Sequence, residues 1–189
     1  MTTGRRERKK AATRQAIADA ALRLFLEHGY DRVSIRDIAD AADVSTTTLF
    51  KHFTGKEALV FDMDEDREAA LVDAVRQRPA GQSIVDALRE HVHEHSLAIA
   101  AHPQIAEFNA LVDGTPALRA YSERMWSRHA DALSAAIAAE VGAESDDVAS
   151  AALARFVLEI PAVLRGRDDP AAAVDTIFDL LRSGWEPRP

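Results

Sequence analysis

The sequence predicts an all-α protein. Apolar residues recur at three- and four-residue spacings along the chain, and no segment shows the alternation of apolar and polar residues that is typical of a strand. The glycines and prolines fall at sites that separate these segments, where they end one helix or begin the next. With 189 residues, 47% of them hydrophobic, the chain can bury a core without disulfides or a structural metal.

Two helices are expected first. The first runs from about Lys10 to His28, and Gly29 ends it. The second opens at Ser34 and ends near Ala42. Its N-cap hydroxyl has a capping-box partner in Asp37, three positions on.

A third, short helix is expected after a tight turn at Asp43 and Val44. It runs from Ser45 to about Lys51, with Leu49 and Phe53 facing inward. The sequence from Thr54 to Glu57 predicts another capping box, at the start of a longer helix that ends near Gln77. Two short helices joined by a turn and flanked by longer helices are typical of a helix-turn-helix domain.

Charge is distributed unevenly along the chain. Residues 1–60 contain 11 Lys and Arg against 8 Asp and Glu, whereas residues 61–189 contain 12 against 23, so the acidic remainder produces the formal net charge of −8. The densest cationic run consists of Arg5, Arg6, Arg8, Lys9, Lys10 and Arg14. Such a run is expected at a phosphate-binding end, although a disordered solubilising arm has the same composition.

Composition also excludes several classes of site. The chain has no cysteine, so disulfides, zinc-thiolate sites and thiol nucleophiles are excluded. No stretch approaches the run of about 18 apolar residues that a membrane helix needs, and no apolar region follows the basic N-terminus as in a signal peptide. A soluble, cytoplasmic protein without a membrane partner is therefore expected.

Three stretches closely resemble the DNA-binding signature of TetR-family repressors: Gly29–Ala39, Ala42–Phe53 and Lys56–Leu59. The resemblance covers about residues 14–60 and implies that the third helix enters the major groove of DNA. It also implies two domains. Residues 1–57 would form a three-helix helix-turn-helix domain with a basic N-terminal arm, and residues 58–189 a helical ligand-binding and dimerisation domain.

Two positions depart from the family pattern. Asp43 stands where glycine is usual in the turn, and aspartate enters the left-handed region more readily than most residues. Phe50 stands where tyrosine is usual in the recognition helix, so a phenol contact to phosphate is lost.

Ten residues are predicted to contact DNA: Ser34, Arg36, Ser45, Thr46, Thr47, Thr48, Phe50, Lys51, His52 and Lys56. The exposed set of the third helix contains no Arg, Asn or Gln for bidentate recognition of a base, so Arg36 is the strongest candidate for a guanine contact. Threonine methyl groups can pack on thymine methyl groups. Ser34, His52 and Lys56 are expected to hold phosphates. Helix capping and a solvated surface are the alternative roles of the threonine run.

The remainder, from about Ala58 to Trp185, is expected to form five or six helices. After the helix that ends near Gln77, the expected helices run from Ser83 to about Ala101, over a short segment after Pro103, from Pro116 to Gly142, over 145–165 and over 170–183.

The last two of these helices are apolar around too much of their circumference for a single buried stripe. In TetR-like proteins the two final helices pair with their copies in a four-helix interface, so the resemblance implies a homodimer through 145–165 and 170–183. A hairpin within one chain is the alternative. A dimer would present two recognition helices about 34 Å apart, which suits a palindromic operator in double-stranded DNA.

A small-molecule effector is expected among the middle helices. The candidate contacts are Phe61, Leu88, His95, Leu97, Glu107, Phe108, Leu111, Tyr121, Met125, Trp126, His129 and Phe156. Ordinary core packing is the alternative role of the aromatic members. The end of the third helix and the acidic start of the fourth resemble a TetR subgroup likened to binders of acyl-CoA-type ligands. A repressor released by a small apolar or acyl-type effector is therefore expected.

One pattern points to a different class of protein. His91, Glu94 and His95 match the H-x-x-E-H pattern of one class of zinc peptidases. A catalytic zinc site needs a third protein ligand, and the remaining candidates have no companion motif. These candidates are His102, Glu107 and His129.

We therefore predict no catalytic residues, no cofactor and no metal. A role in metal sensing or ligand orientation is left open for the cluster of His91, His93 and His95. A helical enzyme or metal-binding protein, and a coregulator whose helix-turn-helix binds protein, are the alternative functions.

Overall fold

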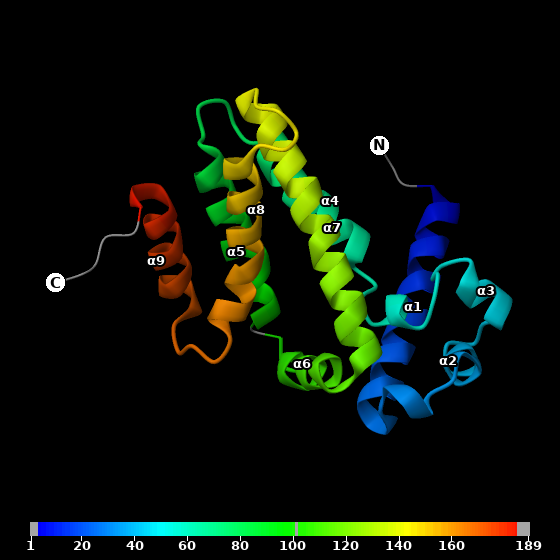
Figure 1. The fold of residues 1–189 in the computed structure, drawn as a ribbon. Coiled ribbons are helices and arrows are strands. Elements are labelled where there is room, and N and C mark those ends of the chain that lie inside the picture. Colours follow the sequence, from blue (N-terminus) through cyan, green and yellow to red (C-terminus); the bar gives the residue numbers. More distant parts are fainter. Residues whose placement is uncertain (1–3, 101, 185–189) are drawn as a thin grey trace. The chain divides into compact units, whose positions relative to one another are not determined.

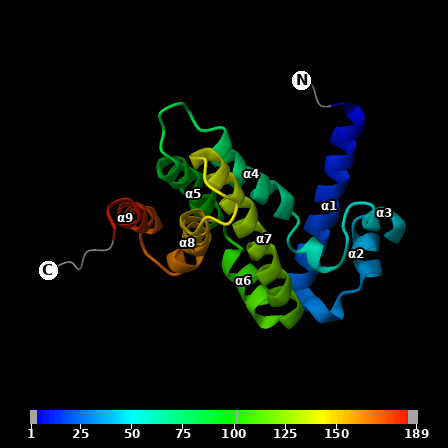
Figure 2. The ribbon, with the colours of Figure 1, turned by 45° about the horizontal axis from the view of Figure 1, so that its top comes forward.

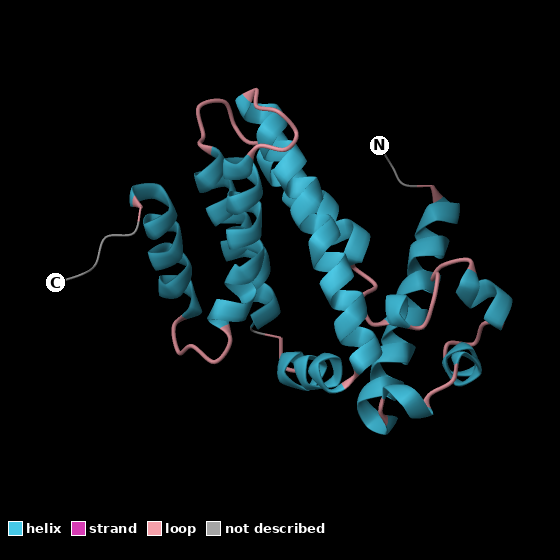
Figure 3. Ribbon diagram, in the orientation of Figure 1, coloured by secondary structure: helices cyan, strands magenta, loops and turns pink. Residues whose placement is uncertain are grey.

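The computed structural model describes residues 4–100 and 102–184; the side chains of Ser96, Ala98 and Ala100 are not among those described. Within these ranges every regular element is a helix and there is no strand (Figure 3). The predicted all-α fold class is confirmed.

Three α-helices and two single 3₁₀ turns form the N-terminal part of the fold. They are α1 (Arg5–His28), η1 (Tyr30–Arg32), α2 (Ile35–Ala41), α3 (Thr46–Phe50) and η2 (Glu57–Leu59). Figures 1 and 2 both show the short helices α2 and α3 beside α1. Helix α1 begins five residues before the predicted start, and at its first turn the backbone N–H of Gly4 donates to Glu7 Oε2 over 3.3 Å.

The local signals of the helix-turn-helix are confirmed. Ser34 Oγ accepts from the N–H of Asp37 over 3.2 Å, and Asp37 Oδ2 accepts from the N–H of Ser34 over 2.8 Å. The Ser34 hydroxyl, which donates to Asp37 Oδ2 over 2.7 Å, and the Ser34 N–H both lower the pKa of Asp37. Ser45 caps α3 in the predicted place. Asp43 has φ 52, so the turn between α2 and α3 uses the left-handed conformation that an aspartate tolerates better than most residues.

The predicted long helix from Lys56 to Gln77 is wrong in its first part. The chain makes the single turn η2, and α4 (Asp64–Arg76) begins only at Asp64. Leu59, Val60 and Phe61 are all buried. A continuous helix buries one stripe and cannot bury three successive side chains equally well, so the chain bends here.

The remaining helices follow the predicted pattern. They are α5 (Ile84–Ala100), α6 (Ile105–Gly114), α7 (Pro116–Val141), α8 (Val148–Leu164) and α9 (Pro170–Ser183). Ser83 caps α5, and Gly142, with φ 69, follows the end of α7. Helix α8 begins at Val148 instead of near residue 145 because Asp147 is its N-cap, accepting from the N–H of Ser150 over 2.8 Å.

Packing divides the chain into two compact units. The first comprises residues up to Asp64 together with Ala106–Ser122, and the second comprises Glu65–Ile105 together with the chain from Glu123 onward. The first unit therefore contains the helix-turn-helix, and the second contains both helices predicted to dimerise.

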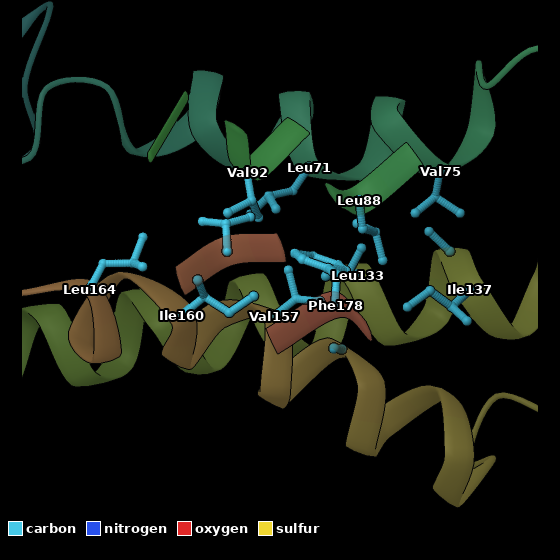
Figure 4. Close-up of a cluster of buried hydrophobic side chains, with 13 residues drawn as sticks. Leu71, Val75, Leu88, Val92, Leu133, Ile137, Val157, Ile160, Leu164 and Phe178 are labelled. Carbon is cyan, nitrogen blue, oxygen red and sulfur yellow. The ribbon is translucent and has the colours of Figure 1, made fainter. Parts of the chain in front are cut away.

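The core of the second unit consists of aliphatic side chains around Phe178. Helices α4, α5, α7, α8 and α9 all contribute, and α5 packs along α9 (Figure 4). The largest members are Leu71, Leu88, Leu133, Ile137, Ile160, Leu164 and Phe178. No helix in the described part of the chain is both long and apolar enough to span a bilayer.

Candidate nucleic-acid interface

Helix α3 presents an exposed face supported by a buried one. Leu49 is fully buried and Phe53 is 3% exposed, which anchors the helix in the first unit. On the other side Thr46, Thr47 and Lys51 are exposed. Phe50 is 54% exposed. A single exposed apolar ring is common on protein surfaces, so the contact of Phe50 with DNA stays a prediction.

Three of the residues predicted to contact DNA use their hydroxyl groups for hydrogen bonds at the start of their own helices. Ser45 Oγ accepts from the N–H of Thr48 over 3.1 Å and lies 2.9 Å from Thr48 Oγ1. The hydroxyl of Ser34 donates to Asp37 over 2.7 Å. Capping thus accounts for these hydroxyls, and their contacts to DNA stay predictions.

The predicted guanine contact, Arg36, lies in the first turn of α2. Its side chain is 85% exposed, and its Nε is 3.8 Å from Asp40 Oδ2. Since an exposed ion pair of this kind contributes little, the guanidinium keeps its donors available for a base edge.

Two helices form a cationic cleft of about 460 Å³ in the first unit. Arg6, Glu7 and Lys10 line it from α1, and Lys51 and His52 line it from the end of α3. Burial lowers the pKa of His52, and the nearby Lys10 and Arg14 lower it further. The sequence indicated a basic N-terminal run, but only folding places Arg6 and Lys10 beside the recognition helix.

Arg14 has an internal role that the charge pattern did not reveal. Its Nη1 donates to the carbonyl of His52 and its Nη2 to the carbonyl of Asp62, each over 2.6 Å. The guanidinium carbon lies 4.4 Å from the centroid of the Phe53 ring. Arg14 therefore connects α1 to the end of α3.

Lys56 also has internal partners. Its Nζ donates to the carbonyl of Tyr30 and lies 4.1 Å from the Tyr30 ring centroid and 5.5 Å from that of Phe25. Burial lowers the pKa of the ammonium group. Its phosphate contact stays a prediction, while its internal role is clear from these contacts.

The predicted effector contacts divide between the two units. In the first unit, Phe61 stacks on Tyr121 with ring centroids 5.3 Å apart and meets Phe108 edge to face at 6.1 Å. Leu111 is half-buried, whereas Glu107 is exposed.

In the second unit, Leu88, Met125 and His129 are buried. Trp126 meets His129 edge to face at 5.2 Å, and His129 Nε2 lies 3.8 Å from Glu68 Oε2. Leu97 is half-buried, His95 is exposed and Phe156 is 58% exposed. Phe156 thus lies on the outer face of α8, apart from the buried candidates. An effector role for all of these residues stays a prediction.

The histidine cluster separates on folding. The rings of His91 and His95 stack with centroids 4.2 Å apart, whereas His93 Nε2 lies 3.0 Å from Asp175 Oδ1 on α9. Burial, with the neighbouring His95, lowers the pKa of His91 to about 4. Among the residues described, no group of three or more His, Asp or Glu side chains is arranged to hold a metal ion.

Comparison with known proteins agrees with this geometry. Residues 17–63 match the family model of bacterial regulatory proteins of the tetR family, and residues 82–186 match the model of the MftR C-terminal domain. The transcriptional regulator TcmR of Streptomyces glaucescens is 30% identical over 151 residues, which cover 76% of this chain and 67% of TcmR. MftR of Mycobacterium tuberculosis is 27% identical over 145 residues, which cover 74% and 71% of the two chains.

Solved structures show the same fold. The transcriptional regulator FadR from Bacillus subtilis, in complex with stearoyl-CoA, has a TM-score of 0.57 at 18% identity, over 91% of this chain and 99% of FadR. With the helix-turn-helix geometry and both family matches in agreement, the chain belongs to the TetR family and is a DNA-binding transcriptional regulator, not an enzyme.

Proposed function

We propose that this regulator is a homodimeric, cytoplasmic repressor that binds a palindromic operator and leaves it when a small apolar or acyl-type effector binds. One observation carries the DNA-binding half of the proposal: the exposed face of α3 adjoins a cleft lined by Arg6, Lys10, Lys51 and His52. A face that fits the major groove beside cations that fit phosphates is what a helix-turn-helix needs.

The residues divide into base contacts and phosphate contacts. Arg36 donates two hydrogen bonds to a guanine, while Thr46, Thr47 and Phe50 pack on thymine methyl groups. The cations of the cleft, with Ser34, Ser45, Thr48 and Lys56, hold the backbone on either side. Because base recognition would depend on one arginine and several methyl contacts, we expect a half-site rich in thymine.

Dimerisation through α8 and α9 is supported by apolar side chains that remain exposed in the single chain. Val148 is 80% exposed, Phe156 58% and Val163 45% on α8, and Leu180 is 41% exposed on α9. Exposed apolar side chains gathered on two adjacent helices indicate a protein contact surface. A second copy of the chain would cover them.

The effector half of the proposal is a linkage between two binding events. A ligand that prefers the DNA-free arrangement of the dimer by a few kcal/mol lowers operator occupancy. The aromatic group of Phe61, Phe108 and Tyr121 and the buried side chains near Trp126 are the proposed contacts. The acyl preference is supported by the sequence resemblance and by the stearoyl-CoA complex of FadR, which shares the fold.

Selection of bound fragments from random DNA tests the proposal. We expect an inverted repeat whose half-sites lie about one helical turn apart. With that operator, Arg36→Ala should cost about 1 to 3 kcal/mol and relax one base position. Lys51→Ala should weaken the binding of all DNA sequences alike. It should also reduce the magnitude of the slope of log K against log salt concentration by about one. No preference for any dyad-symmetric site over bulk DNA would contradict the proposal.

A further inference from the structure

The histidines at alternate positions of α5 have two kinds of surroundings. His93 is engaged with Asp175 of α9, so it belongs to the packing of those two helices. His91 and His95 are one helical turn apart on another face. Among the described residues, the ring contact that each of them makes is with the ring of the other. Their planes are inclined by 18°, so the rings are stacked, and one ring must turn before both can direct a nitrogen lone pair at a single ion. Side chains at this spacing can bind one ion together.

A hydrogen bond orients the second imidazole. His95 Nδ1 lies 3.1 Å from the carbonyl oxygen of His91. A carbonyl only accepts, so Nδ1 carries the hydrogen and the lone pair stays on Nε2. Metal-binding histidines are characteristically oriented by such a bond from the other ring nitrogen. Because His95 is exposed, its Nε2 is accessible to an ion from solvent.

From this geometry we propose that His91 and His95 form a two-imidazole chelate for a divalent transition-metal ion of the class of Cu²⁺, Ni²⁺ and Zn²⁺. Imidazole suits these ions, whereas Mg²⁺ and Ca²⁺ prefer oxygen ligands. With two protein ligands, water fills the remaining positions, so the site is open and exchangeable. It lies in the second unit and does not depend on the DNA-binding proposal.

Calorimetric titration of the full chain with CuCl₂, NiCl₂, ZnCl₂ and MgCl₂ tests the site. At about pH 7.5, where an unperturbed imidazole is mostly neutral, one Cu²⁺ per chain should bind more tightly than Ni²⁺ or Zn²⁺, and Mg²⁺ should not bind. His91→Gln and His95→Gln should each weaken Cu²⁺ binding about tenfold or more. His93→Gln, two residues from each, is the matched control and should leave it unchanged.

Electron paramagnetic resonance of the Cu²⁺ complex provides a second measurement. Hyperfine coupling to two imidazole nitrogens is expected in the wild-type chain and to one in either variant. The exposed His95 makes His95→Gln informative even if the half-buried His91 position tolerates change poorly. The proposal is overturned if the wild-type chain binds no Cu²⁺, if only one of the two histidines matters, or if all variants bind alike.

Discussion

At the scale of single residues, Asp43 shows how a short side chain meets a backbone requirement. It lies between α2 and α3 with φ 52, and no other non-glycine residue among those described has a positive φ. Its N–H donates to the carbonyl of Asp40 over 3.2 Å, and the N–H of Val44 donates to that of Ala39 over 2.9 Å. The turn that separates the two short helices therefore depends on a left-handed residue.

Replacing Asp43 with glycine should stabilise the protein by about 0.5 to 1 kcal/mol, because glycine adopts this conformation without a Cβ clash. Chemical denaturation measures the change. Ala41→Gly, in the last turn of α2 where φ is negative, is the matched control and should destabilise by a similar amount. An unstable Asp43→Gly variant would mean that the carboxylate itself stabilises the turn.

Arg14 illustrates a cation used for structure. Arg14→Ala should destabilise the first unit by about 2 to 3 kcal/mol, since two charge-assisted bonds to part-buried carbonyls are lost. Hydrogen exchange should show faster opening of the α3 amides, because the His52 carbonyl loses its donor. The exposed Arg8 on the same helix is the control, and Arg8→Ala should stay within about 0.5 kcal/mol. Equal effects of the two variants would refute the structural role.

At the scale of elements, α1 and α3 act together. One cationic cleft is formed by residues about 45 positions apart in the sequence. Its cationic lining consists of Arg6 and Lys10 on α1 with Lys51 and His52 after α3. The depressed pKa of His52 keeps its imidazole neutral near pH 7. The groups that face it are Arg6, Glu7, Lys10, Arg14 and Lys51.

Operator binding should therefore be linked to proton uptake at His52. A DNA phosphate in the cleft favours the imidazolium and raises the pKa in the complex above that in the free protein. The sign follows: the complex binds more protons, so the association constant rises as the pH falls below neutrality through the pKa of the complex. Fluorescence anisotropy across this range, at constant ionic strength, measures the slope.

His52→Gln should remove this pH dependence. His28→Gln, an exposed histidine at the far end of α1, should retain it. A slope that survives in His52→Gln would assign the proton to another group, and a flat wild-type profile would show that no phosphate lies near this imidazole.

At the scale of the whole molecule, two identical chains would present two copies of α3. Phe156→Asp places a charge in the apolar surface of α8 and should give a monomer instead of a species of twice 20.6 kDa. Loss of the second half-site contact should weaken operator binding about 100-fold or more. Light scattering and anisotropy measure the two effects.

Val141 provides the control for this substitution. It is also 58% exposed but ends α7, outside the two predicted dimerisation helices, so Val141→Asp should remain dimeric and bind the operator normally. A Phe156→Asp variant that stays dimeric with full affinity would exclude the α8 surface from the interface.

The sequence by itself determined the helices, most of their ends and which face of α3 is exposed. Ser34, Ser45 and Ser83 cap the helices predicted for them, because a cap joins groups about three residues apart and depends on little else. Burial of Leu49 likewise followed from spacing alone.

Only the tertiary structure decided the roles of Arg14 and Lys56 and the position of the bend between η2 and α4. Lys56 meets a carbonyl 26 residues away and Arg14 meets two that are 38 and 48 residues away, so no local pattern distinguishes them from solvated arms or phosphate ligands. The bend after η2 also depends on packing, since it buries three successive side chains. Interactions between distant positions acquire their geometry only when the chain has folded. The roles of Arg14, Lys56 and the bend could therefore not be predicted from the local sequence.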